Sequence, residues 1–224
     1  MKIEYACSLG PFCHSANILK QNNLKECSYP FDWIFSNNKN IIHCIKNKFN
    51  IFLNKAYYTN ISNNRCGHLY YNKDLFRHHN PLINENDYNY FVRCVNRFKD
   101  LLHNKGHKLF ITILVNNDSI NKKIIKNIIK FNKKLSIYTS NYTLLVVLHL
   151  KNKQQNYHTF TYKDNIHFLE LHTLSESDGL LFKNDNDNKY LDNIIKTRYT
   201  INKGDLKDYI LYYVHELFNI IDKY

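Results

Sequence analysis

The second half of the chain alternates apolar runs with amphipathic segments. A near-continuous apolar run at residues 108–115 is typical of a strand buried on both faces, and residues 142–150 and 166–172 predict two further buried strands. Apolar side chains at helical spacing predict three helices: residues 120–135, 188–199 and 205–224. Strands that alternate with helices in this way predict a largely parallel sheet with helices on both faces.

The first half of the chain has a less regular pattern. Residues 2–9 predict a short buried strand that ends at Gly10-Pro11, and residues 14–21 predict a helix directly after it. Two further helices are predicted at residues 41–53 and 87–103, the second with Asn86 or Asp87 as N-cap. The remaining segments are expected to be loops: an aromatic-rich one at 28–35 and an Asn- and His-rich one at 57–84.

These patterns predict one α/β hydrolase-like domain over residues 1–224. We expect a three-layer αβα architecture of the Rossmann-like, doubly wound kind, with a mostly parallel sheet and residues 55–86 as an irregular insertion. A length of 224 residues suits one ordinary domain. The chain has only 5 Gly and 3 Pro, which argues against a glycine-rich nucleotide-binding loop.

The chain is basic, because 31 Lys and Arg against 19 Asp and Glu give a net charge of +12. Arg, which makes bidentate contacts with phosphates and bases, occurs at only five of these positions; the rest are Lys, which acts as a solvated point charge. Lys, Asn, Ile and Tyr are all abundant, as in proteins from AT-rich genomes. The charge therefore supports a nucleic-acid or acidic-membrane partner only weakly.

The sequence shows no sign of secretion, membrane insertion or metal binding. No apolar run reaches the ~20 residues that span a bilayer, and the N-terminus lacks the apolar stretch of a signal peptide. We therefore expect an intracellular protein whose six cysteines are free thiols. There is no Cys-x-x-Cys pair, and the acidic segment 184–188 lacks the later Gly and Glu of a calcium loop. We expect no metal and no cofactor.

The first candidate for chemistry is Cys13, which follows the predicted strand and the Gly10 turn. At or near the first turn of a helix, unpaired backbone N–H groups and the helix dipole favour an anion, so the pKa of a thiol falls there. The N–H groups of Gly10, Cys13 and His14 can also form an oxyanion hole for acyl transfer. The alternative is that Cys13 is a small buried hydrophobe, as most cysteines are.

Two other segments carry polar groups that can serve a nucleophile. Asp32 lies between Phe31 and the only Trp, Trp33, and a partly buried carboxylate there can orient an imidazole or hold a loop through backbone N–H bonds. His78 and His79 form the only adjacent pair of histidines, and a His is the usual base for a Cys nucleophile. Neighbouring side chains generally point apart, so at most one of the two should face a given site.

Taken together, these segments resemble a family of papain-like cysteine peptidases found in bacteria and large DNA viruses. Two blocks carry the resemblance most specifically: Ser8-Leu9-Gly10-x-x-Cys13 and Ser28-Tyr29-Pro30-Phe31-Asp32-Trp33-Ile34. Looser similarity extends over most of the chain in three later stretches: residues 76–80, 90–98 and 187–191. A viral member would act in the host cytoplasm.

The resemblance implies a thiol hydrolase that acts on a peptide or acyl substrate. Cys13 would be the nucleophile, His79 the first choice of base with His78 the second, and Asp32 the orienting carboxylate. Trp33, Tyr70 and Arg77 are expected to contact substrate. Papain-like enzymes place the Cys on a long helix and the His on a following antiparallel sheet, whereas this chain predicts a strand, a turn and then the Cys. The resemblance is therefore expected to lie in the chemistry more than in the fold.

Two other functions remain open at the level of sequence. A non-catalytic glycan- or nucleic-acid-binding module would use its tyrosines and lysines, and would leave Cys13 buried and more than ~7 Å from any imidazole. A sugar-modifying transferase would need a nucleotide-sugar pocket, which the scarcity of Gly disfavours. The sequence does not predict an oligomeric state.

Overall fold

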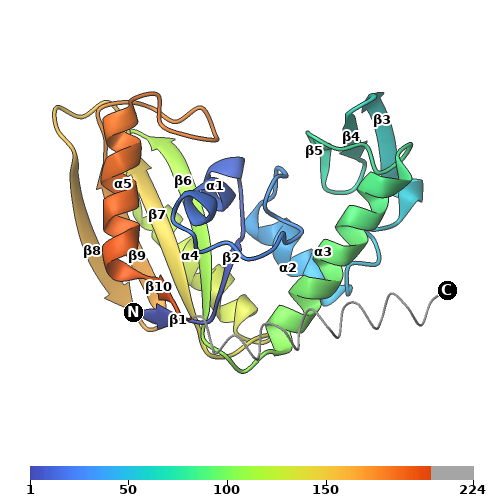
Figure 1. Cartoon of the computed structure of the whole chain (residues 1–224), viewed down its shortest axis with the longest axis horizontal. Coiled ribbons are helices and arrows are strands. Elements are labelled where there is room, and N and C mark those ends of the chain that lie inside the picture. The colour runs from blue at the N-terminus through green and yellow to red at the C-terminus, as the bar shows by residue number, and fades with distance from the viewer. Residues whose placement is uncertain (203–224) are drawn as a thin grey trace.

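The computed structural model of the chain describes residues 1–202 and shows three sheets and five α-helices there (Figure 1). The helices are α1 (Cys13–Gln21), α2 (Asn38–Lys46), α3 (Glu85–His103), α4 (Lys122–Leu135) and α5 (Asp185–Arg198), with a 3-10 turn at Lys55–Tyr57. The first five strands are β1 (Lys2–Ile3), β2 (Tyr5–Ser8), β3 (Tyr58–Ser62), β4 (Arg65–His68) and β5 (Asn72–Phe76). The others are β6 (Lys108–Asn117), β7 (Tyr142–Leu150), β8 (Tyr157–Lys163), β9 (Ile166–His172) and β10 (Thr200–Ile201).

The central sheet has the strand order β2-β6-β7-β9-β8. Its first four strands are parallel, and β8 pairs antiparallel with β9 at the edge. Every residue of β7 is buried, as expected of a strand covered on both faces. The predicted α/β fold with a mostly parallel sheet is confirmed.

Two apolar clusters lie on the two faces of this sheet (Figure 1). On one face α1 and α5 pack against the sheet through residues such as Ile18, Leu19 and Ile195. On the other face α2, α3 and α4 bury an aromatic-rich cluster that includes Phe98 and Phe131. The carboxyl ends of the parallel strands therefore open between these two helical layers, where α/β proteins bind their ligands.

The segment that the sequence analysis expected to be irregular differs from that prediction. Strands β3, β4 and β5 form an antiparallel sheet, and Tyr58 and Phe76 from it belong to the same aromatic cluster as α3. These strands are short, polar and partly exposed, so they give little alternating apolar signal. The same reason explains why β8, an edge strand with an exposed amino end and three exposed residues at its carboxyl end, was not predicted.

Other boundaries also differ from the predicted ones. The strand predicted at 2–9 is divided, because β1 pairs with β10 and β2 with β6. Helix α2 ends at Lys46, and the chain then turns with positive φ at Lys48 and Phe49 instead of continuing to residue 53. Helix α3 begins at Glu85 with Asn84 as its N-cap. The acidic segment 184–188 forms the N-cap and first turn of α5.

The predicted helix at 205–224 lies outside the described residues. None of the described helices is both long and apolar enough to span a bilayer.

Candidate active site at the start of helix α1

Helix α1 begins at Cys13, directly after a tightly held turn at the carboxyl end of β2. Gly10 has a positive φ of 73°, and a Cβ atom there would lie 2.2 Å from Oγ of Ser36, so only glycine fits. The Gly10 carbonyl accepts hydrogen bonds of 2.8 Å from both Ser15 Oγ and Thr112 Oγ1. The turn thus fixes the backbone that presents the Cys13 thiol.

Cys13 meets an imidazole from a distant part of the chain. Its Sγ atom lies 4.0 Å from Nε2 of His78, which follows β5 on an exposed loop. The neighbouring Arg77 places its guanidinium 5.2 Å from the centre of the Phe35 ring and 3.9 Å from the Asp74 carboxylate. The half-buried sulfur therefore has a hydrogen-bonding base beside it and a cation nearby.

The electrostatic environment of Cys13 differs from the sequence-based expectation of a lowered thiol pKa. Burial raises the pKa of Cys13 above the ordinary value for cysteine. Its own backbone N–H and the charge of Arg77 act in the opposite direction, and the buried Asp32 carboxylate raises the pKa further. The helix N-terminus does favour the thiolate, but the loss of hydration outweighs that effect.

Two of the three expected oxyanion-hole N–H groups already have acceptors. The N–H of His14 donates to the carbonyl of Gly179 at 2.8 Å, and the N–H of Gly10 donates to Ser8 Oγ at 3.2 Å. The N-cap residue, Phe12, supplies no side-chain bond to the first turn. Among the described residues, the N–H of Cys13 has its own sulfur as its partner, so it is the member of the expected set that can turn to a bound carbonyl oxygen.

His79, the first-choice base from sequence, is held by a different partner. Its Nδ1 atom lies 2.9 Å from Asp87 Oδ1, and its ring stacks on Tyr90 at 4.9 Å with an interplanar angle of 20°. The second oxygen of Asp87 accepts the backbone N–H of Asn80 at 2.7 Å. Asp87 therefore fixes the two residues that follow His78. In the sequence, Asp87 stood out only by its place at the start of a predicted helix, so nothing there indicated this role.

Asp32 is buried in an ion pair with Lys25 and accepts the N–H of Tyr29 at 2.9 Å. Burial raises the pKa of Asp32, and the charge and hydrogen bond of Lys25 oppose that rise. In the described part of the chain, Asp32 has no hydrogen bond to a histidine. Asp32 holds the loop at 28–35 in place. Its charged partner in the structure is Lys25, whereas the resemblance implied that it would orient an imidazole.

A family model described as "putative papain-like cysteine peptidase" matches residues 4–155. The chain belongs to this family. The matched region contains Cys13, Asp32, His78 and His79, and it ends just after β7. No curated protein and no solved structure matches the chain.

For this papain-like family member, the expected substrate contacts lie in separate places. The charge of Arg77 acts on the Cys13 thiol, as described above. Trp33 is half-buried, with Lys25 Nζ 6.0 Å from its ring centre. Tyr70 stacks on His43 at 4.7 Å, and its hydroxyl lies 3.1 Å from His43 Nε2. Within residues 1–202, no group of three or more His, Cys, Asp or Glu is placed to hold a metal ion.

A second pair of histidines lies behind the Cys13 turn of this peptidase-like chain. His14 Nδ1 lies 2.9 Å from Ser177 Oγ, and His149 Nε2 lies 2.7 Å from Thr173 Oγ1. Both rings pack against Phe182, with centroids 4.7 and 4.6 Å away. Burial lowers the pKa of His14 to about 3 and that of His149 to about 4, so both are neutral near pH 7. Both histidines therefore act as buried, neutral hydrogen-bonding groups.

Proposed function

We propose that the protein is a thiol-dependent hydrolase or acyltransferase with Cys13 as nucleophile and His78 as base. The 4.0 Å separation of Cys13 Sγ and His78 Nε2 carries the proposal. It lies well inside the ~7 Å limit beyond which an imidazole cannot activate a thiol, and so disfavours the non-catalytic module. Membership of the papain-like cysteine peptidase family supports the same chemistry.

In this mechanism the thiol loses its proton as it attacks, because burial keeps the resting thiol neutral. His78 Nε2 accepts the proton while a bond forms between Sγ and the acyl carbon. The carbonyl oxygen becomes an oxyanion beside the N–H of Cys13. The intermediate collapses, and the leaving amine, alcohol or thiol takes the proton from His78. His78 then removes a proton from water or another acceptor, which attacks the acyl carbon; the bond to sulfur breaks, and the sulfur recovers the proton from His78.

His79 and Asp87 have a positioning role in this proposal. The 4.0 Å distance is at the outer limit for a hydrogen bond to sulfur, and catalytic hydrogen bonds are often long before substrate binds. The His79–Asp87 bond and the Asn80–Asp87 bond anchor the chain immediately after His78. The exposed His78 ring is then free to turn about its side-chain bonds towards Cys13.

Acylation by p-nitrophenyl acetate tests the proposal without knowledge of the natural substrate. We expect acetylation of Cys13, located by mass spectrometry of peptides, to be lost in Cys13→Ala and retained in Cys27→Ala, a matched half-buried thiol. His78→Gln should slow acylation at neutral pH by roughly 100-fold, the lower end of general-base effects, and His79→Gln by much less. Acylation of His78→Gln at the wild-type rate would refute the proposed base.

A further inference from the structure

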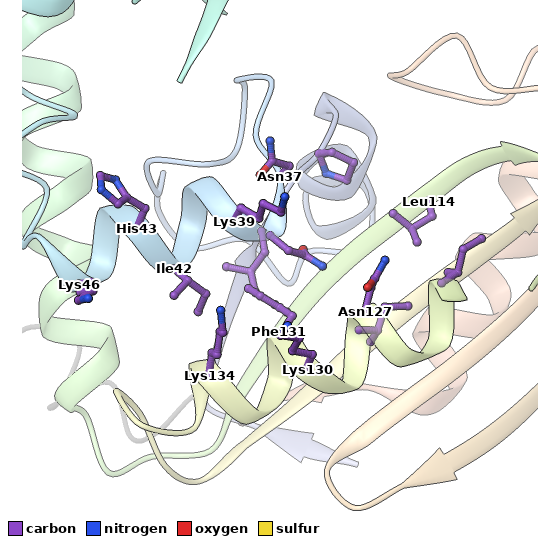
Figure 2. Close-up of a pocket in the computed structure, with 15 residues that line it drawn as sticks. Asn37, Lys39, Ile42, His43, Lys46, Leu114, Asn127, Lys130, Phe131 and Lys134 are labelled. Atoms are coloured by element: carbon purple, nitrogen blue, oxygen red, sulfur yellow. The ribbon is translucent and has the colours of Figure 1, made fainter. Parts of the chain in front are cut away.

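A groove of about 760 Å³ lies between α2 and α4, on the face of the sheet opposite α1 (Figure 2). Its volume falls within the ~300–1,000 Å³ typical of small-molecule sites. Figure 2 shows Ile42 of α2 and Phe131 of α4 pointing into the space between the two helices. Leu9 and Leu114 extend this apolar lining to the carboxyl ends of β2 and β6. The floor of the groove is therefore formed by aliphatic and aromatic side chains.

Lysines surround this apolar floor. Lys39 and Lys46 line the groove from α2, and Lys130 and Lys134 line it from α4 (Figure 2). None of the described residues that line it is acidic. Among residues 1–202, none of the four lysines has an ion-pair or hydrogen-bond partner, in contrast to Lys25 in its pair with Asp32. The rim thus carries positive charge that residues 1–202 do not neutralise.

The positive field extends beyond the rim because the surrounding chain lacks carboxylates. Residues 33–73, which include α2, contain no Asp or Glu, and neither do residues 119–163, which include α4. Like charges that converge on a concave, low-dielectric surface raise the local concentration of counter-ions. An anion is therefore attracted to this groove, while a divalent cation is repelled.

We infer that the groove binds a single-chain anionic amphiphile, a molecule with one alkyl or acyl chain and a carboxylate or phosphate head. The chain would lie against Ile42 and Phe131, and the head would contact the lysines of the rim. Burial of alkyl surface supplies most of the affinity, at ~25 cal/mol per Å². The lysines select an anionic head over a neutral one. This inference does not depend on the chemistry proposed for Cys13.

The lining fits this ligand better than it fits a nucleic acid. Single strands bind through bases stacked on exposed aromatic rings, and bidentate phosphate contacts come from Arg. The groove has no Arg, Phe131 is buried in its floor, and the His43 ring is already stacked on Tyr70. Besides the lysines, His43 and three asparagines, the groove offers apolar surface.

Calorimetric titration of the full-length protein with sodium decanoate, below its micelle concentration, tests the inference. We expect decanoate to bind at least about tenfold more tightly than decanol, which lacks the charge, or acetate, which lacks the chain. Decanol that binds as tightly as decanoate would overturn the role of the lysines. Failure of decanoate to bind would overturn the site itself.

Matched variants place the ligand in the groove. Lys130→Glu combined with Lys134→Glu should weaken decanoate binding roughly tenfold, because two favourable charge contacts become repulsive. Lys126→Glu combined with Lys133→Glu makes the same charge change on exposed positions of α4 outside the lining, and should have little effect. Ile42→Gln should weaken binding by a similar factor at unchanged net charge.

Two results would overturn the proposed ligand. Equal loss in both lysine pairs would mean that decanoate responds to overall charge and not to the groove. The second result is that decanoate does not bind, but a thymidine oligonucleotide or phosphatidylglycerol vesicles bind in a way that depends on Lys130 and Lys134. That result would assign the surface to a polyanion or a membrane.

Discussion

The Sγ atom of Cys13 lies 4.0 Å from Nε2 of His78, and the two residues are held in different ways. The turn before Cys13 is fixed by the hydroxyl groups of Ser15 and Thr112, both buried. His78 is exposed, and within the described part of the chain it is anchored through its neighbours His79 and Asn80, which bond to Asp87. The position of the sulfur is thus fixed by the fold, whereas the orientation of the imidazole can change.

Arg77→Gln should raise the pKa of the Cys13 thiol, because the Arg77 charge favours the thiolate. The pH dependence of Cys13 alkylation by iodoacetamide measures this. The wild-type midpoint should lie above that of a free cysteine, and the variant midpoint a further few tenths of a unit higher, since an exposed charge is screened by solvent.

The exposed Arg93→Gln provides the control, because it removes the same charge from α3. Its midpoint should remain at the wild-type value. A wild-type midpoint near neutral pH would instead indicate a preformed thiolate–imidazolium pair and contradict the neutral resting thiol.

Gly10→Ala should destabilise the protein by about 2–4 kcal/mol and slow acylation of Cys13. The new Cβ would meet Ser36 Oγ at 2.2 Å, and alanine disfavours the positive φ of this residue. The added variant Ser36→Ala removes the clashing oxygen and should recover the stability except for about 1 kcal/mol of backbone strain.

Gly179→Ala separates these two effects. Gly179 also has positive φ, at 98°, but a Cβ there would meet only Phe12 at an ordinary 3.7 Å. Urea unfolding should therefore show a loss of about 1 kcal/mol for this variant. Equal losses for the two glycine variants would mean that the contact with Ser36 does not matter.

The sequence predicted the buried strands of the central sheet accurately and missed most of the short or exposed strands. The ranges of β7 and β9 were predicted to the residue, because each is a central strand with an uninterrupted run or clear alternation of apolar side chains. The edge strand β8 and the small sheet β3–β5 were missed, since β8 depends on its pairing with β9, and the small sheet depends on pairing and on contacts with α3 such as Phe76 with Phe91.

The candidate site was predictable at Cys13 but not at its partners. A strand, a glycine turn and a helix are local features, and α1 does begin at Cys13. The choice between His78 and His79 depended on Asp87, whose side chain reaches back from the first turn of α3. The partner of Asp32 is Lys25, which lies seven residues earlier and outside the loop at 28–35. The contacts of Asp32 and Asp87 run across loops, so no helix or strand period in the sequence predicts them.

Lys25→Met should destabilise the protein more than Asp32→Asn does. The Asp32 side chain is 1% exposed and Lys25 is 12% exposed, so an unpaired Asp32 loses its hydration while an unpaired Lys25 still reaches water. Breaking a buried pair costs about 3–5 kcal/mol, and Asp32→Asn should fall below that range.

The cost of Lys25→Met should also depend on pH. Burial raises the pKa of Asp32, and loss of Lys25 raises it further. A carboxyl group whose pKa is raised in the folded state makes the fold progressively less stable as pH rises from its unfolded pKa to its folded pKa, above which the cost is complete. Urea unfolding at pH 5 and pH 8 should therefore show the smaller deficit at pH 5. If Asp32 instead orients the base, Asp32→Asn would slow acylation without a matching loss of stability.

Acid should destabilise the fold through His14 and His149. Their folded pKa values, about 3 and about 4, lie below the unfolded value of 6.5, so the unfolded chain binds more protons between these limits. The neutral histidines contribute stability that is complete above pH 6.5 and is lost as pH falls towards 4. The slope should be about 1.4 kcal/mol per pH unit for each histidine.

Burial lowers the pKa of His149, and its hydrogen bonds leave no free position for a second proton. Its Nδ1 accepts the N–H of Asn116 at 2.9 Å, and its Nε2 faces Thr173 Oγ1, whose own proton goes to the Ser175 carbonyl. A second proton would displace the N–H of Asn116. His149→Gln should therefore lower stability at pH 7 and flatten the slope between pH 6.5 and 4, whereas the exposed His103→Gln should do neither. Urea unfolding across this range measures both effects, and an unchanged slope in His149→Gln would contradict the assignment.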